Sequence, residues 1–183
     1  MKKIFIYVLL MIAATSVIIL GILSNHNETF LEKEGLDGLT TIQMVEKLEA
    51  KTIDPNNYNS SITATELIIF TNEFTYRFDI PDYLFYLSIA PYINQTHPCS
   101  THSLVTCRGE LKNTKFNVVV KDDLENIIFE QEVTTGSNGF AGIWLPRNIT
   151  GTIVVEYDNF SATSKIETFN QSKTCLTTLK LTP

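Results

Sequence analysis

His97, Cys99, His102 and Cys107 lie within eleven consecutive positions, which hold two of the three histidines and two of the three cysteines. Thiolates and imidazoles are the ligands that soft and borderline metal ions prefer. The third cysteine, Cys175, lies far along the chain and is the natural distant partner of the cluster. This arrangement indicates a metal site made of a local loop and a returning thiol.

Other chemistries use the same residue types. Structural zinc fingers have short C-x2-4-C and H-x3-5-H spacings, which the seven residues between Cys99 and Cys107 do not match, so zinc is less favoured than Cu(I). A disulfide between Cys99 and Cys107, with Cys175 as a buried apolar side chain, is the plain alternative. A cysteine protease would need an orienting group that is not identifiable.

The loop must turn back on itself, because an extended chain rises about 3.3 Å per residue and would set Cys99 and Cys107 about 26 Å apart. We expect Ser100 or Thr101 to cap one turn of helix, which would place Cys99 and His102 on one side.

Arg108 and Gly109 follow the second cysteine directly. They predict a turn, and the positive charge of Arg108 would lower the pKa of a neighbouring thiol.

The first residues indicate export. Lys2 and Lys3 precede an apolar run over residues 4–23, and about 20 such residues suffice to span a bilayer. A cleaved signal begins in the same way, but this run is long for a signal and no clear A-x-A site follows it, which favours an anchor. In both cases the chain from about Ser24 onward is extracytoplasmic, and only the N-terminal segment contacts the membrane.

Charge and cysteine count narrow the function further. The chain has 14 Lys and Arg against 20 Asp and Glu, and with Lys2 and Lys3 set apart the exported part carries about −8. Without a basic stripe, nucleic acid is excluded as a partner, and so is attachment to anionic lipid by charge. Three cysteines leave at least one outside any intramolecular disulfide. Intermolecular pairing, a free reactive thiol or metal ligation would each explain it, and the nearby histidines favour metal ligation.

A single helix is predicted near the N-terminus of the exported part. Thr40 or Thr41 can cap it, with Gln43 placed for a capping box on Thr40. An apolar stripe follows until the predicted end near Lys51. The stripe is formed by Met44, Val45 and Leu48. Residues 54–57 predict a turn, and the Ser/Thr-rich stretch that follows, up to Ala64, is expected to form a linker.

Strand patterns fill the rest of the chain. They cover residues 66–71, 75–80, 84–93, 116–121, 127–134, 140–145, 152–157, 162–168 and 176–181. The regular turn signals between the later strands are typical of a small β-sandwich. The Asn138-Gly139 pair predicts a tight hairpin.

These patterns together predict an α+β, mainly β fold. A signal peptide or membrane anchor occupies residues 1–24, and a small N-terminal region of helix and strands occupies residues 25–93. Residues 94–183 are expected to hold the metal-binding loop and a C-terminal antiparallel β-sandwich.

Several stretches carry a resemblance to a known family. They are FYLSIAPY at 85–92, THxC at 96–99, HSLxTCxGE at 102–110, NGF at 138–140, GxWLPR at 142–147 and TCLTTL at 174–179. From about residue 36 to residue 181 the chain resembles the CueP family of periplasmic copper-binding proteins. The uncleaved anchor would be a departure from the plain periplasmic signal of that family.

The resemblance implies copper binding by Cys99, Cys107 and Cys175, with His97 or His102 nearby. It also implies a role in extracytoplasmic copper tolerance, reduction of Cu(II) to Cu(I) by the thiols, and an exported protein that receives the copper. A monomer and a dimer both remain open. The competing function, from a different class, is a β-sandwich interaction module on the cell surface, stabilised by a Cys99 to Cys107 disulfide.

Overall fold

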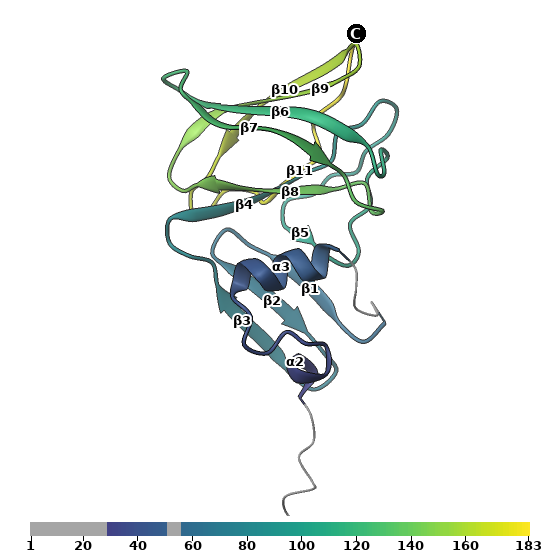
Figure 1. Ribbon diagram of the computed structural model, residues 1–183, viewed down its shortest axis with the longest axis vertical. Helices are drawn as coiled ribbons and strands as arrows, with labels where there is room; N and C mark the ends of the chain where they lie inside the picture. Colours follow the sequence, from purple (N-terminus) through teal and green to yellow (C-terminus); the bar gives the residue numbers. More distant parts are fainter. Residues whose placement is uncertain (1–28, 51–55) are drawn as a thin grey trace, which may run out of the picture. The chain divides into compact units, whose positions relative to one another are not determined.

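Residues 29–50 and 56–183 are described by the structure, a computed structural model (Figure 1). The chain divides into two units, Met1–Gly38 and Leu39–Pro183. In the described part of the first unit, helix α2 (Phe30–Lys33) begins with a capping box between Thr29 and Glu32, which the sequence analysis does not predict. The expected signal or anchor lies outside the described residues. Among the helices within them, none is long and apolar enough to cross a membrane.

Helix α3 (Thr41–Glu49) opens the second unit. Thr40 is its N-cap and forms the predicted capping box with Gln43. The predicted stripe is buried, and the helix ends at Glu49 rather than near Lys51, which lies outside the described residues. The Thr41 hydroxyl donates to the Asp79 carbonyl oxygen at 2.8 Å, which fixes the start of the helix.

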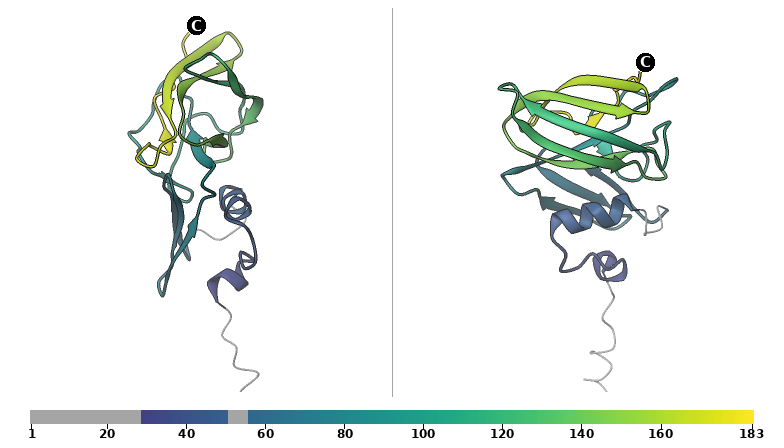
Figure 2. Two further views of the ribbon diagram at one scale, coloured as in Figure 1. Left: turned by 90° about the vertical axis from the view of Figure 1, so that its left-hand side faces the viewer. Right: turned by 45° about the horizontal axis from the view of Figure 1, so that its top comes forward.

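The helix covers one face of a four-stranded antiparallel sheet (Figures 1 and 2). Its order is β3 (Thr75–Asp79), β2 (Glu66–Phe70), β1 (Asn59–Ile62) and β5 (His102–Ser103). Two predictions are wrong here. The expected linker contains β1, because pairing on both sides overrides its polar sequence. The expected helical turn after Ser100 is absent, because His102 and Ser103 pair with Ile62 and Ser61.

Two further sheets make up the C-terminal part of the second unit. One has the order β10 (Phe160–Glu167), β9 (Thr150–Tyr157), β6 (Lys115–Asp122) and β7 (Ile127–Thr134); the other has the order β11 (Cys175–Leu176), β4 (Leu84–Ile89) and β8 (Ala141–Pro146). All pairings are antiparallel except that of β11 with β4. The predicted mainly β, antiparallel fold with a small helical N-terminal region is confirmed.

Several predicted strand ends differ from the observed ones. The run at 84–93 ends at Ile89, and the run at 176–181 yields only β11, with Lys180 forming an isolated bridge to Tyr92.

The two C-terminal sheets face each other across one apolar core (Figure 2). Because side chains alternate along a strand, β4 contributes Phe85, Leu87 and Ile89 to this core and turns Tyr86 and Ser88 to its other face. The face of the three-stranded sheet that is turned away from the core is therefore free to carry a site.

The Asn138-Gly139 pair does not form the predicted hairpin, because β7 and β8 belong to different sheets. Gly139 has φ +78 and lies against the loop after Cys107: the Gly109 N–H donates to the Asn138 carbonyl oxygen at 2.6 Å. A Cβ added at Gly109 would lie 2.3 Å from the Gly139 carbonyl oxygen. Two glycines are therefore needed for these backbones to touch.

Candidate metal centre

The five predicted ligand residues gather into two overlapping groups. The ligand atoms of His97, Cys99 and Cys107 all lie within 4.8 Å of one another, and so do those of His102, Cys107 and Cys175. The Cys99 and Cys107 sulfurs are 3.7 Å apart, and the Cys175 sulfur is 4.0 Å from His102 Nδ1. All three cysteines are free thiols. Cys107 is the member that the two groups share.

Strand alternation brings Cys175 to the loop. In β11, Leu176 packs against the apolar core while Cys175, opposite Ser88 of β4, points to the other face. There it is buried in a small cluster with Ala90, Cys107 and Phe140, on which Cys99 packs. The adjacency of Cys175 and the loop, which the sequence analysis expects, is thus present in the structure.

Thr174 locks this arrangement. Its hydroxyl donates to the Ile62 carbonyl oxygen at 2.6 Å and accepts from the His102 N–H at 3.1 Å. Its own N–H donates to the Ser100 carbonyl oxygen at 3.0 Å. One buried threonine therefore joins β1, the loop and the strand that carries Cys175.

The turn from Ser103 to Cys107 closes on the sulfur itself. The Ser103 N–H donates to Cys107 Sγ at 3.3 Å, and the Ser103 hydroxyl accepts from the Thr106 N–H at 3.0 Å. Arg108 donates to the carbonyl oxygens of Val105 and Cys107. It is not among the groups that lower the pKa of Cys107, so its predicted role in lowering a thiol pKa finds no support.

Glu110 forms hydrogen bonds to the segment just before the loop. Its carboxylate accepts from the N–H groups of Ile93, Asn94 and Gln95 and from the Asn94 side chain. Burial raises the pKa of this carboxyl, but the hydrogen bonds outweigh it and lower the pKa to about 2. The segment that leads to His97 is thereby held in one conformation.

Phe140 separates the two histidines. Its ring centroid lies 6.0 Å from that of His97 and 4.8 Å from that of His102. His97 and Cys99 are half-buried, whereas His102, Cys107 and Cys175 are buried. The site therefore has an outer side open to water and an inner side closed from it.

The surroundings shift the pKa values of the three thiols in different directions. The Cys175 thiol hydrogen bonds to Cys107 and lowers its pKa to about 3, and His102 and the Ser103 N–H act in the same direction against burial. The same hydrogen bond raises the pKa of Cys175 well above its usual range, with burial adding to it. Burial and the neighbouring Cys107 charge raise the pKa of Cys99, although its contact with Cys175 lowers it. Cys107 is the thiolate of the cluster.

The cation next to this thiolate is His102. Burial alone would lower the pKa of the imidazole, but contacts with the Cys107 sulfur and the Glu49 carboxylate outweigh it and raise the pKa to about 8. A metal ion at His102 must therefore displace a proton.

Three residues beside the site are missed by the sequence analysis. Glu49 Oε1 lies 2.7 Å from His102 Nε2, the Tyr86 hydroxyl donates to Glu49 Oε1 at 3.0 Å, and Asn138 Nδ2 donates to Glu49 Oε2 at 3.3 Å. Burial of the Tyr86 hydroxyl, and next the Glu49 carboxylate, raise the pKa of Tyr86 well above its usual range. Two sequence signals could have pointed to them. Glu49 is an acidic residue in the last turn of a helix, where a carboxylate is disfavoured, and Asn138 belongs to an Asn-Gly pair.

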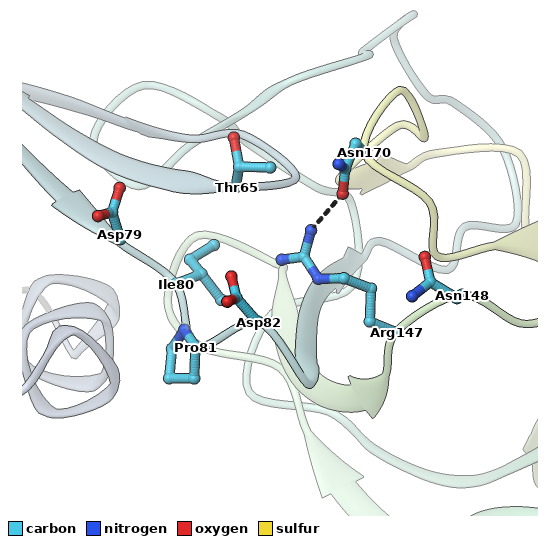
Figure 3. Close-up of a pocket in the computed structure, with 8 residues that line it drawn as sticks. All are labelled: Thr65, Asp79, Ile80, Pro81, Asp82, Arg147, Asn148 and Asn170. Atoms are coloured by element: carbon cyan, nitrogen blue, oxygen red, sulfur yellow. Dashed lines mark hydrogen bonds between the residues drawn. The ribbon is translucent and has the colours of Figure 1, made fainter.

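One cavity lies at the cluster and another lies away from it. One of about 410 Å³ is lined by Cys99 and Cys175 and bordered by Lys165 and Lys173. The cavity drawn in Figure 3, of about 550 Å³, holds no cysteine or histidine among its lining residues. In it the Arg147 guanidinium donates to Asn170 at 2.8 Å, as part of a structural joint rather than a metal site.

A family model described as periplasmic copper-binding protein CueP matches residues 43–180. The chain belongs to the CueP family. The crystal structure of S. CueP is similar to it with a TM-score of 0.80 and 43% sequence identity, over 84% of this chain and 95% of that chain. A search among curated proteins finds no significant match.

Membership in the CueP family confirms the resemblance described from the sequence and makes this a copper-binding protein of a periplasmic family. The donor set fits that metal, because soft sulfur with imidazole is what copper ions select in proteins.

Proposed function

We propose that the chain holds Cu(I) outside the cytoplasm through Cys99, Cys107 and Cys175, with His102 on the inner side and His97 on the outer side. The observation that supports this most is the pair of ligand groups that share Cys107. Two or three thiolates satisfy the low coordination number of Cu(I), and a site rich in sulfur favours it over zinc. The half-buried outer group receives the ion, and the buried inner group retains it.

We also propose that the thiols reduce Cu(II). The sulfurs of Cys99 and Cys107 are 3.7 Å apart, and an S–S bond of about 2.05 Å requires only a small movement. The Cys99 thiol and the Cys107 thiolate would form a disulfide, release one proton and give two electrons, which reduce two Cu(II) to two Cu(I). Cys175 and His102 then remain as ligands on the buried side.

This chemistry suits a role in copper tolerance. Bound Cu(I) is the cargo, and an exported protein that takes it from the half-exposed Cys99 side is the expected partner. We place the protein in the periplasm or on the outer face of the membrane, with residues 4–23 serving as a signal or an anchor. In this proposal, residues 94–183 form the metal-binding domain, which comprises the loop and the β-sandwich.

Anaerobic titration of the reduced protein with Cu(II) tests both parts. We expect two Cu(I) per chain, measured with a Cu(I)-specific dye after denaturation, and a Cys99 to Cys107 disulfide in the peptide map. Cys107→Ser should lose this product and most of its Cu(I) affinity in competition with the dye, whereas Ser100→Ala, an exposed neighbour, should behave as wild type.

Wild-type affinity in Cys107→Ser would contradict the shared site. A permanent disulfide in freshly purified protein, with one inert thiol and no copper uptake, would instead favour the disulfide-stabilised interaction module.

A further inference from the structure

The two nitrogens of His102 face different partners. The imidazole is fully buried, with Nε2 2.7 Å from Glu49 Oε1 and Nδ1 4.0 Å from Cys175 Sγ. A carboxylate can only accept a hydrogen bond, so Nε2 must carry the hydrogen. Nδ1 is left on the side of the sulfurs.

Glu49 is itself held from three directions. The Tyr86 hydroxyl donates to Oε1 at 3.0 Å, the Asn138 amide donates to Oε2 at 3.3 Å, and only 16% of the Glu49 side chain is exposed. Tyr86 is fixed in turn, because a Cβ at Gly142 would lie 1.8 Å from its hydroxyl oxygen. Its ring also packs edge-on against Trp144 at 4.9 Å. The carboxylate therefore has a single orientation.

The helix that carries Glu49 does not explain its presence. Glu49 is the last residue of α3, where the helix dipole favours a cation and disfavours a carboxylate. The hydrogen-bond donors that surround the carboxylate lie outside the helix, in β4, β5 and the loop before β8. An acidic residue at this position is therefore accounted for by the site and not by the helix.

We propose that Glu49 is a positioning residue of the copper site, which holds His102 with its hydrogen on Nε2 and so makes Nδ1 the copper-binding nitrogen. The inference rests on the proposed function, since it takes His102 as a ligand. A carboxylate behind a ligating histidine fixes the orientation of the ring and raises the basicity of its free nitrogen. Glu49 lies behind the imidazole and does not contact the ion.

NMR of histidine labelled with ¹⁵N tests this directly, because Cu(I) has a closed shell and leaves the signals narrow. In the Cu(I)-loaded full-length protein we expect His102 to carry its hydrogen on Nε2, and its Nδ1 resonance to shift when the metal is added. Glu49→Ala should show a mixture of both tautomers and bind Cu(I) about 10–100-fold more weakly. Glu49→Gln keeps an oxygen facing Nε2 and should recover most of the affinity.

Glu46→Ala is the matched control, because Glu46 is an exposed residue of the same helix, and it should behave as wild type. Loss of Cu(I) binding in Cys107→Ser, together with wild-type affinity and tautomer in Glu49→Ala, would overturn the positioning role alone. Retained binding in Cys107→Ser would overturn the proposed function instead. If Glu49→Ala does not fold, the spectrum of the Cu(I)-loaded wild type decides: a copper-shifted Nε2, or a hydrogen that stays on Nδ1 in the loaded protein, refutes the inference.

Discussion

Cys107 belongs to both candidate ligand groups. Its surroundings lower the pKa of its thiol. A neighbouring thiol, an imidazole and a backbone N–H all point at its sulfur. Because only a thiolate binds a metal ion or attacks as a nucleophile, this sulfur is ready at a pH where an ordinary cysteine is protonated.

The thiolate gives a pH prediction. The pKa of Cys107 is lowered to about 3 from its ordinary value near 9, so the charged form is present above pH 3 and is lost only as the pH falls through that value. We expect the thiolate absorbance near 240 nm to persist in the reduced, metal-free protein from pH 8 down to pH 4.5. Cys107→Ser should remove it and Cys99→Ser should keep it. Absorbance that appears only above pH 8 in the wild type would contradict the assignment.

The candidate ligands could be found from the sequence because cysteine and histidine are rare in this chain and their clustering is visible without a fold. Glu49 could not, because it is one of 20 acidic residues. Only the packing of α3 beside β5 sets it apart from the others. Arg108 shows the opposite error: a charge next to a cysteine in sequence is not among the groups that lower the pKa of its thiol.

At the scale of elements, alternation along β4 and β11 separates the core from the site. Phe85 and Leu176 face the core, while Tyr86 and Cys175 face the cluster. A slip of one residue in the pairing of β11 would therefore bury Leu176 at the site and move the thiol into the core.

Arg147 joins three segments around the start of β4. Its guanidinium donates to the carbonyl oxygens of Ala64 and Leu84. It also donates to the Asn170 side chain (Figure 3). It thus joins the turn before β2, the start of β4 and the segment after β10.

We expect Arg147→Ala to lower the free energy of unfolding by about 1.5–3 kcal/mol, because charged hydrogen bonds to partly buried carbonyl oxygens are lost. Arg147→Lys should recover little, since one ammonium cannot reproduce the fork. Urea denaturation measures both, with Arg77→Ala as the control: its exposed pair with Glu66 should contribute about 0–1 kcal/mol. Equal losses in Arg147→Ala and Arg77→Ala would contradict the role of this joint.

Helix α3 could be predicted because its capping box and stripe are local signals. Strand β1 could not, since its polar residues become a strand only through pairing with β2 and β5. The hairpin predicted at Asn138-Gly139 fails for a related reason. The type of turn depends on local sequence, but the sheet that each flanking strand joins depends on distant segments.

For the whole second unit, the site exists only after long-range folding. Its candidate ligands come from the loop over residues 97–107 and from β11, and residues from α3, β4 and the loop before β8 contact His102 or Glu49 behind it. The mainly β class could be predicted from strand alternation, whereas the division into three sheets depends on pairings between distant segments.

Cu(I) should therefore stabilise the folded chain. A ligand that binds only the native state adds about 2.7 kcal/mol when its free concentration is 100 times its dissociation constant. We expect a higher melting temperature in buffered Cu(I), followed by circular dichroism under anaerobic conditions, and a smaller gain in Cys175→Ser. An equal gain in wild type, Cys175→Ser and Cys107→Ser would show that the ion binds elsewhere.

The close approach of Gly109 and Gly139 means that this site cannot be excised. A synthetic peptide of residues 97–107 would contain four of the five candidate ligands, yet it would lack the neighbouring loop that closes the buried side. Such a peptide would be a flexible chelator without an inner and an outer face. Anyone who grafts this copper site onto another scaffold must transplant the glycine pair with it.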